Sequence, residues 1–114
     1  MARQEPGEPY FRISLDEAKS MLDGGNAVVI DVRRDDEWAE GHVQGAAHIP
    51  VDDVLQRIDE LPQDKDLLFI CAQGVRSGLA CEMAAAMNFD SERLFNIEEG
   101  TGAWIERGLP SERG

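Results

Sequence analysis

The sequence predicts an α/β domain in which helices cover both faces of a central sheet. Residues 27–32 and 67–70 are apolar runs, broken only by Asp31, and strands buried on both faces of a parallel sheet have this composition. Helical patterns separate these runs from each other and from weaker strand patterns. This alternation predicts a three-layer α/β/α architecture with right-handed crossovers. The length of 114 residues suits one such domain.

The first helix has the clearest start signal. A short strand is predicted at residues 10–13, and the next four residues form a capping box, in which Ser14 and Glu17 satisfy the first free amides of a helix. Apolar residues then repeat at helical spacing: Leu15, Ala18, Met21 and Leu22. The pair Gly24-Gly25 ends this helix before the buried strand at residues 27–32.

Two further helices are predicted around a short strand in the middle of the chain. Acidic residues in the first turn suit the dipole of a short helix at residues 35–39. A strand at residues 46–49 is closed by Pro50. The next helix, residues 52–61, begins at paired acids and ends before Pro62. Its predicted apolar face is Val54, Leu55, Ile58 and Leu61.

The last part of the chain repeats the alternation. After the buried strand at residues 67–70 comes a tight turn and a helix over residues 77–87, in which Ser77 is expected as the cap and Asn88 as a left-handed stop. A strand at residues 94–97 and a short helix around residues 103–105 complete the predicted domain. It spans residues 10–110 between flexible tails at residues 1–9 and 111–114.

The chain is strongly acidic, with 11 Lys and Arg against 23 Asp and Glu and a formal net charge of −12. Phosphate contacts need clustered Lys and Arg, so we expect no binding of nucleic acid or of an anionic membrane surface. No apolar stretch approaches the roughly 20 residues of a membrane span, and the first residues lack the apolar segment of a secretory signal. A cytoplasmic location is therefore expected.

The cysteines and histidines show no metal-binding spacing. Cys71, Cys81, His42 and His48 form no CxxC or HxxxH pair, so the sequence predicts no metal site, and we expect no cofactor. Two cysteines are too few for a disulfide scaffold, although the sequence leaves a single bridge between them open.

The candidate site is the loop after the buried strand 67–70, because open parallel sheets bind ligands at the carboxyl ends of their strands. Cys71 lies at this position. Gly74 can take a positive φ and turn backbone N–H groups inward as an anion nest. The following helix N-terminus and Arg76 add positive charge. These features favour the thiolate, so we predict a lowered pKa and a nucleophilic Cys71. The alternative is a cysteine that merely ends a buried strand.

Several motifs in order resemble the rhodanese-like sulfurtransferases along nearly the whole chain. The active-site loop of that family, CxxGxR[ST], matches the run Cys71, Ala72, Gln73, Gly74, Val75, Arg76 and Ser77. Its DVR, E[YFW], GHIxGA and IP elements match Asp31-Val32-Arg33, Glu37-Trp38, residues 41–46 and Ile49-Pro50. Its terminal GGxxAWxxxGxP pattern matches residues 100–110, with Glu99 in place of the first glycine. Asn88 and Cys81 also depart from the family pattern.

The resemblance implies a five-stranded parallel sheet of order 3-2-4-5-1. It also implies that Cys71 takes a sulfane sulfur from a donor such as thiosulfate and becomes a persulfide. A thiophilic acceptor, either cyanide or a small or protein thiol, then removes that sulfur. Inward amides of the loop from Ala72 to Arg76, together with that of Ser77, would hold the anionic outer sulfur.

Residues near the loop have structural interpretations beside functional ones. Arg76 either binds an anion or ties the loop to carboxylates such as Asp31. Asp31 and Arg33 are expected to support the loop in a buried network with Glu37. His42 is interpreted as structural, since transfer to an ionised thiolate needs no base. Cys81 is interpreted as a small buried side chain rather than a resolving thiol.

Two other classes of function stay open. Phosphatases and arsenate reductases use Cys-x5-Arg, whereas this chain has Cys-x4-Arg, whose smaller ring of amides suits a single sulfur better. A non-catalytic interaction module is the other class, and the presence of Cys71 counts against it. We expect a monomer with a shallow, open site. A basic protein partner that binds the acidic surface is a further hypothesis.

Overall fold

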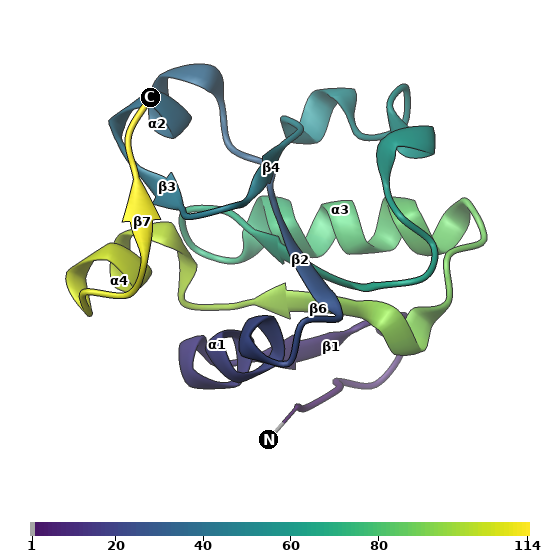
Figure 1. Cartoon of the computed structure of the whole chain (residues 1–114). Coiled ribbons are helices and arrows are strands. Elements are labelled where there is room, and N and C mark those ends of the chain that lie inside the picture. Colours follow the sequence, from purple (N-terminus) through teal and green to yellow (C-terminus); the bar gives the residue numbers. More distant parts are fainter. Residues whose placement is uncertain (1) are drawn as a thin grey trace.

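The structure, a computed structural model, describes residues 2–114 and contains the predicted parallel sheet (Figure 1). Its strands are β1 (Phe11–Ile13), β2 (Ala27–Asp31), β4 (Ala47–His48), β5 (Asp66–Ile70) and β6 (Leu94–Ile97). They are ordered β1-β6-β5-β2-β4, and every neighbouring pair is parallel. Counted along the chain this is the order 3-2-4-5-1, so the expected fold class and topology are confirmed.

The helices divide between the two faces of the sheet. They are α1 (Leu15–Asp23), α2 (Asp35–Glu40), α3 (Val75–Ala86) and α4 (Gly100–Glu106). Alternation along β5 creates two cores, because Leu67 and Phe69 pack with residues of α3, whereas Leu68 and Ile70 pack with residues of α1 and α4. The next residue in this alternation is Cys71, which therefore faces α3.

Local signals set the ends of two helices as predicted. Ser14 and Glu17 form the reciprocal capping box of α1, with the Glu17 amide donating to Ser14 Oγ over 3.1 Å. Asn88 has a φ of 72° and follows α3 as its left-handed stop. Glu99 adds a contact that the sequence did not predict, since its Oε1 accepts the Leu15 amide at 2.9 Å and caps α1 from a distant part of the chain.

The predicted helix at residues 52–61 is wrong. The segment instead contains two 3₁₀ turns, η1 (Val51–Asp53) and η2 (Ile58–Glu60), and a third, η3 (Ser91–Arg93), precedes β6. Buried Val54 and Leu61 each lie three residues after another apolar residue, and a 3₁₀ turn places such pairs on one side. Spacings of three therefore satisfy the core without a continuous α-helix.

A small antiparallel sheet was missed by the sequence analysis. It pairs β3 (His42–Val43) with β7 (Ser111–Glu112), which lies in the segment expected as a C-terminal tail. At the other end of the chain Arg3 forms an antiparallel bridge with Arg12. Two-residue strands carry too little alternation to be recognised in a sequence. Among the helices of residues 2–114, none has the length and apolar character needed to cross a bilayer.

Candidate active site

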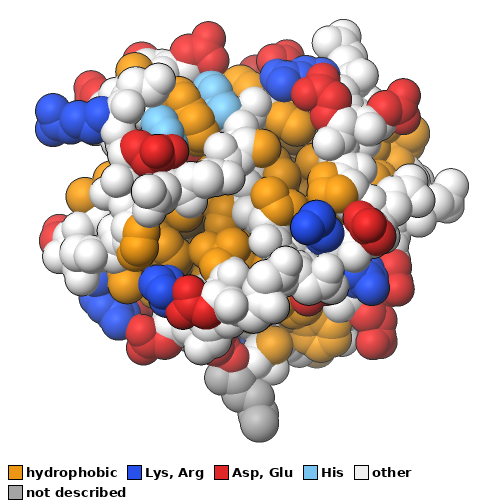
Figure 2. Space-filling model, in the orientation of Figure 1, with side chains coloured by type: hydrophobic (Ala, Val, Ile, Leu, Met, Phe, Trp, Pro, Cys, Tyr) orange, Lys and Arg blue, Asp and Glu red, His pale blue; other side chains and the backbone are white. Residues whose placement is uncertain are grey.

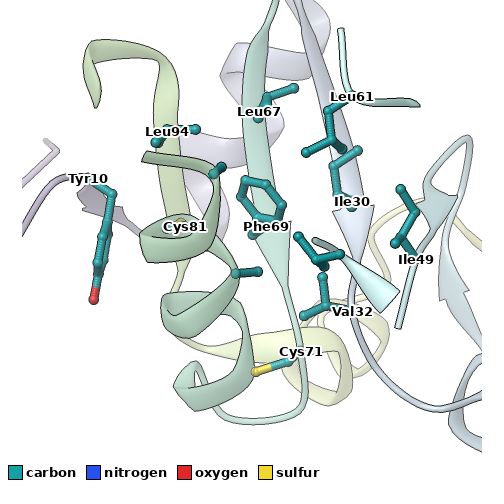
Figure 3. Packing of buried hydrophobic residues seen from close by; sticks show 13 residues of the cluster. Tyr10, Ile30, Val32, Ile49, Leu61, Leu67, Phe69, Cys71, Cys81 and Leu94 are labelled. Carbon is teal, nitrogen blue, oxygen red and sulfur yellow. The ribbon is translucent and has the colours of Figure 1, made fainter. Parts of the chain in front are cut away.

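Cys71 lies directly after β5, with its sulfur directed toward the first turn of α3 (Figure 3). The Gly74 amide donates to Cys71 Sγ over 3.0 Å, and Ser77 Oγ lies 3.3 Å from the same sulfur. Residues 72–76 thus curl back over the sulfur, and the two contacts come from the loop and from the first turn of α3. The arrangement places hydrogen-bond donors where a negative sulfur would need them.

Gly74 makes this curl possible. It has a φ of 87° and forms the N-cap of α3, and a Cβ at this position would lie 3.0 Å from the Glu98 carbonyl oxygen. The helix therefore begins at Val75, two residues earlier than predicted, and Ser77 is not its cap. Ser77 instead lies fully buried in the first turn, where its hydroxyl reaches the sulfur.

The remaining loop residues face outward. Ala72 and Gln73 are exposed, and Val75 is 78% exposed at the start of α3. The Gln73 amide nevertheless acts on Cys71, since it is one of the backbone groups that lower the pKa of the thiol. The loop therefore presents its backbone to the sulfur and its side chains to solvent.

Gly100 and Thr101, at the start of α4, contact the backbone of Cys71 and Ala72. The sequence did not predict them as site residues. Gly100 has a φ of 84°, and a Cβ there would come within 2.0 Å of the Ala72 carbonyl oxygen. The Thr101 amide donates to the Cys71 carbonyl over 2.9 Å. The glycine of the terminal motif was the available signal, because close backbone approach is a common reason for glycine.

Asn96 is a third site residue that the sequence did not predict. It is 3% exposed on β6, where its Oδ1 accepts the Ser77 hydroxyl at 2.6 Å and its Nδ2 donates to the Gly74 carbonyl over 3.0 Å. The signal was present in the sequence, since a polar residue interrupts the apolar strand Leu94–Ile97 beside β5. A buried amide in a central strand needs partners, and here the partners are loop residues.

Arg76 pairs with Glu37 rather than with Asp31, which corrects the suggested partner. Its Nη1 and Nη2 lie 2.7 and 3.0 Å from the two Glu37 carboxylate oxygens. This pair holds the pKa of Glu37 at about 2, with the Arg76 hydrogen bonds as the main cause. Both terminal nitrogens of Arg76 therefore donate to Glu37, and the pair joins α3 to α2.

Asp31 and Arg33 form a separate buried pair at the end of β2. Arg33 Nη2 lies 2.9 Å from Asp31 Oδ2 and also donates to the Gly41 carbonyl over 2.7 Å. Asp31 is fully buried and Arg33 is 7% exposed. The expected single network with Glu37 is thus two neighbouring pairs, one around β2 and one around the loop.

Opposing influences set the ionisation of Cys71. Burial raises the pKa of the thiol and is the largest single influence. Hydrogen bonds from the Ser77 side chain and from the backbone of Ser77, Gln73 and Gly74 act in the other direction. Together they outweigh burial, so that the pKa of Cys71 lies below its ordinary value.

The expected open site is not what the structure shows at the sulfur. Cys71 is 1% exposed, because the loop closes over Sγ. A cavity of about 290 Å³ lies beside α2 and α4, where Arg33, Glu37 and Thr101 line it. Another of about 420 Å³ borders the loop at Gln73, Gly74 and Val75. Cys71 is not in the lining of either cavity.

His42 and Cys81 have the structural surroundings that were expected. His42 stacks on Trp38 with ring centroids 3.4 Å apart, and Trp38 also stacks on His48. Both histidines appear beside an apolar side chain on the face shown in Figure 2, among scattered Asp and Glu. Cys81 lies fully buried further along α3, where burial raises its pKa, and neither cysteine forms a disulfide (Figure 3).

Comparison with known proteins adds to this geometry. The model of the rhodanese-like domain matches residues 14–107. The putative sulfurtransferase YtwF of Bacillus subtilis is 38% identical over 76 residues, which cover 67% of this chain and 71% of that protein. A sulfurtransferase of Allochromatium vinosum is 31% identical over 93 residues, covering 82% of this chain and 85% of that protein.

A solved structure agrees with these relatives. The human single-domain sulfurtransferase TSTD1 is similar with a TM-score of 0.73 at 28% identity, over 89% of this chain and 98% of that one. The family model covers most of the sequence. The chain therefore belongs to the rhodanese-like domain family, and its relatives include proteins named as sulfurtransferases.

Proposed function

We propose that this protein is a sulfurtransferase that carries a sulfane sulfur as a persulfide on Cys71. The observation that carries the proposal is the convergence of loop donors on one sulfur, with the Gly74 amide 3.0 Å from Sγ. Backbone groups of Gln73 and Ser77 act on the same sulfur, so these donors balance the negative charge of the Cys71 thiolate.

In the first proposed step the Cys71 thiolate attacks the outer sulfur of thiosulfate. An S–S bond forms between Sγ and that sulfur while the S–S bond of thiosulfate breaks, and sulfite leaves with the electron pair. The protein then carries an anionic persulfide. Because Cys71 is 1% exposed, this step requires the loop of residues 72–76 to open enough to admit the donor sulfur.

In the second step a thiophilic acceptor attacks the outer persulfide sulfur. With cyanide the new bond is carbon–sulfur, thiocyanate leaves, and the electron pair of the broken S–S bond returns to Cys71 as thiolate. A small thiol or a protein thiol that reacts as its thiolate would take the sulfur in the same way, as a persulfide of its own. No proton transfer is needed, and no metal or cofactor takes part in either step.

Intact mass spectrometry tests this proposal. After incubation with thiosulfate we expect the wild-type protein to gain the mass of one sulfur atom and to lose it again on addition of cyanide. Cys71→Ser is expected to gain nothing. Cys81→Ala is the matched control, because Cys81 is fully buried with a raised pKa and should not affect loading.

Two results would contradict the proposal. One is a sulfur gain that persists in Cys71→Ser, which would move the nucleophile elsewhere. The other is a wild-type protein that stays unmodified by thiosulfate and by other sulfane sulfur donors such as polysulfide. The second result would favour a non-catalytic interaction role for the domain.

A further inference from the structure

The Asn96 side chain has a fixed orientation beside the loop. One of its terminal atoms lies 3.0 Å from the Gly74 carbonyl oxygen, and only the NH₂ group can donate to that acceptor. The amide oxygen must therefore be the atom 2.6 Å from Ser77 Oγ. Since an amide oxygen carries no hydrogen, the Ser77 hydroxyl is the donor in this contact.

Ser77 has one hydroxyl hydrogen but two neighbours that can accept it. Besides Asn96 Oδ1 at 2.6 Å, Cys71 Sγ lies 3.3 Å from the Ser77 oxygen. While Ser77 donates to Asn96, the sulfur contact is satisfied only if the Cys71 thiol donates to Ser77. A thiolate has no hydrogen to give, so it can bind the Ser77 hydroxyl only by taking its hydrogen away from Asn96, whatever the Ser77 backbone contributes.

We propose that Asn96 is a positioning residue for Cys71. The Asn96 amide oxygen accepts the Ser77 hydroxyl hydrogen and competes for it with the Cys71 thiolate. In the thiol state the hydrogen bonds run from Cys71 to Ser77 and from Ser77 to Asn96. In the thiolate state the Ser77 hydroxyl turns to the sulfur, and the amide oxygen of Asn96 loses its donor. The side chain is 3% exposed, so water does not readily replace that donor.

The competition gives Asn96 a role in sulfur loading, and this part rests on the proposed persulfide. In a persulfide the negative charge lies on the outer sulfur, and Sγ carries neither a proton nor a full charge. Ser77 can then return its hydrogen to Asn96. The buried hydrogen bond that ionisation breaks is restored when sulfur is bound, so Asn96 favours the loaded protein over the free thiolate.

The charged groups around Cys71 do not replace this control. Arg76 interacts with both Cys71 and Asp31, but it is paired with Glu37, and Asp31 is paired with Arg33. On the β6 side, the backbone of Glu98 borders Gly74 while its carboxylate pairs with Arg3 and Arg12. These carboxylates and guanidinium groups are paired with one another, whereas the Ser77 hydroxyl contacts the sulfur and Asn96 contacts that hydroxyl.

A double-mutant cycle on the free protein tests the proposal without any sulfur donor. The background is Cys81→Ala, so that the ultraviolet absorbance of the thiolate reports Cys71 alone as pH is raised. Asn96→Ala frees the Ser77 hydrogen, which lowers the pKa of Cys71, but it also releases the Gly74 carbonyl, which raises the pKa. In a Ser77→Ala background only the second effect operates.

We therefore expect the pKa shift caused by Asn96→Ala to be lower by about one unit when Ser77 is present than when it is absent. Equal shifts in the two backgrounds, or a difference of the opposite sign, would overturn the proposal. Because the experiment follows ionisation of the free thiol, a failure of sulfur loading would leave its result unchanged. The two proposals can thus fail separately.

A second measurement keeps Asn96 in place and avoids any loss of folding. In ¹H–¹⁵N spectra, the side-chain NH₂ signals of Asn96 should shift with pH in step with Cys71. They should stay constant in Cys71→Ser and move much less in Ser77→Ala. Asn96 signals that do not follow Cys71 in the wild-type protein would contradict the competition for the hydrogen.

Discussion

Arg76 was predicted to bind an anion or to tie the loop to a carboxylate. The structure shows the second arrangement, since its two terminal nitrogens lie 2.7 and 3.0 Å from the Glu37 carboxylate oxygens. A two-point contact between a guanidinium and a carboxylate fixes the orientation of both groups. Arg76 therefore joins the loop and α3 to α2. The Glu37 carboxylate partly neutralises the positive charge of Arg76 near the sulfur.

Removal of the Glu37 charge should destabilise the protein at neutral pH. The pair is partly buried, with side-chain exposures of 27% for Arg76 and 21% for Glu37, so we expect Glu37→Gln to lower the free energy of unfolding by about 1–2 kcal/mol. Urea denaturation at pH 7 measures the loss. Glu60→Gln is the matched control, since its pair with Arg57 is more exposed and should give no measurable change.

The same pair should have a characteristic pH dependence. The folded-state pKa of Glu37 is lowered from 4.5 to about 2, so its contribution is complete above the unfolded value and is lost as pH falls toward 2. The stability difference between wild type and Glu37→Gln should therefore shrink between these pH values. A difference that stays constant down to pH 2.5 would contradict the assigned contact.

At the residue scale the sequence located the candidate nucleophile and its loop, but not every residue that contacts the loop. Cys71, Gly74 and Ser77 share one short motif, whose local spacing is visible in the sequence. Glu37 was expected to support the loop, but in a network with Asp31 and Arg33 rather than as the partner of Arg76. Asn96 comes from β6, and only the sheet order brings it to the loop. Contacts between distant segments depend on topology, which no local pattern contains.

At the scale of elements, the junction between β6 and α4 is the least tolerant part of the site. Gly100 combines a φ of 84° with a backbone approach that leaves no room for a Cβ beside Ala72. Glu99 beside it caps α1 through the Leu15 amide. This turn therefore supports the loop and a helix on the opposite end of the chain at once.

Alanine substitutions at three glycines separate these effects. We expect Gly100→Ala to cost about 3 kcal/mol or more, because conformational strain and a clash with Ala72 add together. Gly108 has a φ of 73°, but a Cβ there would lie in open space. Gly108→Ala is therefore expected to lower the free energy of unfolding by about 1 kcal/mol. Gly102→Ala within α4 has open space and should stabilise by roughly 0.5–1 kcal/mol.

Thermal or urea unfolding of the three variants checks this order. Equal costs at Gly100 and Gly108 would mean that the loop does not press on Gly100 and that the approach to Ala72 is relaxed. A cost at Gly102 would show that α4 is strained elsewhere. The comparison thus tests the support of the loop without any assay of activity.

Elements were predictable where a local rule decides them. The capping box of α1 and the left-handed stop at Asn88 follow from single residues, and both are present. The segment at residues 52–61 was mispredicted because apolar spacings of three occur in 3₁₀ turns as well as in α-helices. The start of α3 was placed late because Ser77 resembles a cap, whereas Gly74 makes the turn.

At the scale of the whole molecule, the net charge of −12 should repel an anionic donor. Acidic side chains are spread around the face in Figure 2 rather than gathered in one place, so the repulsion acts from all sides of that face. The loop donors act only at short range. Long-range repulsion and local attraction at Cys71 therefore have opposite signs, and salt screens the first more than the second.

The rate of sulfur loading from thiosulfate should accordingly rise with ionic strength. Between roughly 10 mM and 150 mM salt the screening length falls from about 30 Å to about 8 Å, and we expect an increase of about twofold or more. Loading is followed by intact mass, and alkylation by neutral iodoacetamide is the control that should not change. A loading rate that falls with salt would show that local positive charge dominates the approach.

The overall architecture was predictable to different depths. Alternating apolar runs and helical patterns predicted the α/β layers, but the strand order came from the resemblance to a known family. The β3–β7 pair joins residues near position 43 to residues near position 111, and its strands are only two residues long. Such a pairing depends on which distant segments the fold brings together, so it could not be found from local sequence.

The ionisation of Cys71 is the most direct test of the site described above. In the Cys81→Ala protein, the ultraviolet absorbance of the thiolate, followed as a function of pH, should give a Cys71 pKa below the value of about 8.5 for a free cysteine. The reason is that the Gly74 amide and its neighbours stabilise the negative sulfur against the effect of burial. A pKa at or above 8.5 would mean that burial prevails and that the loop does not hold an anion.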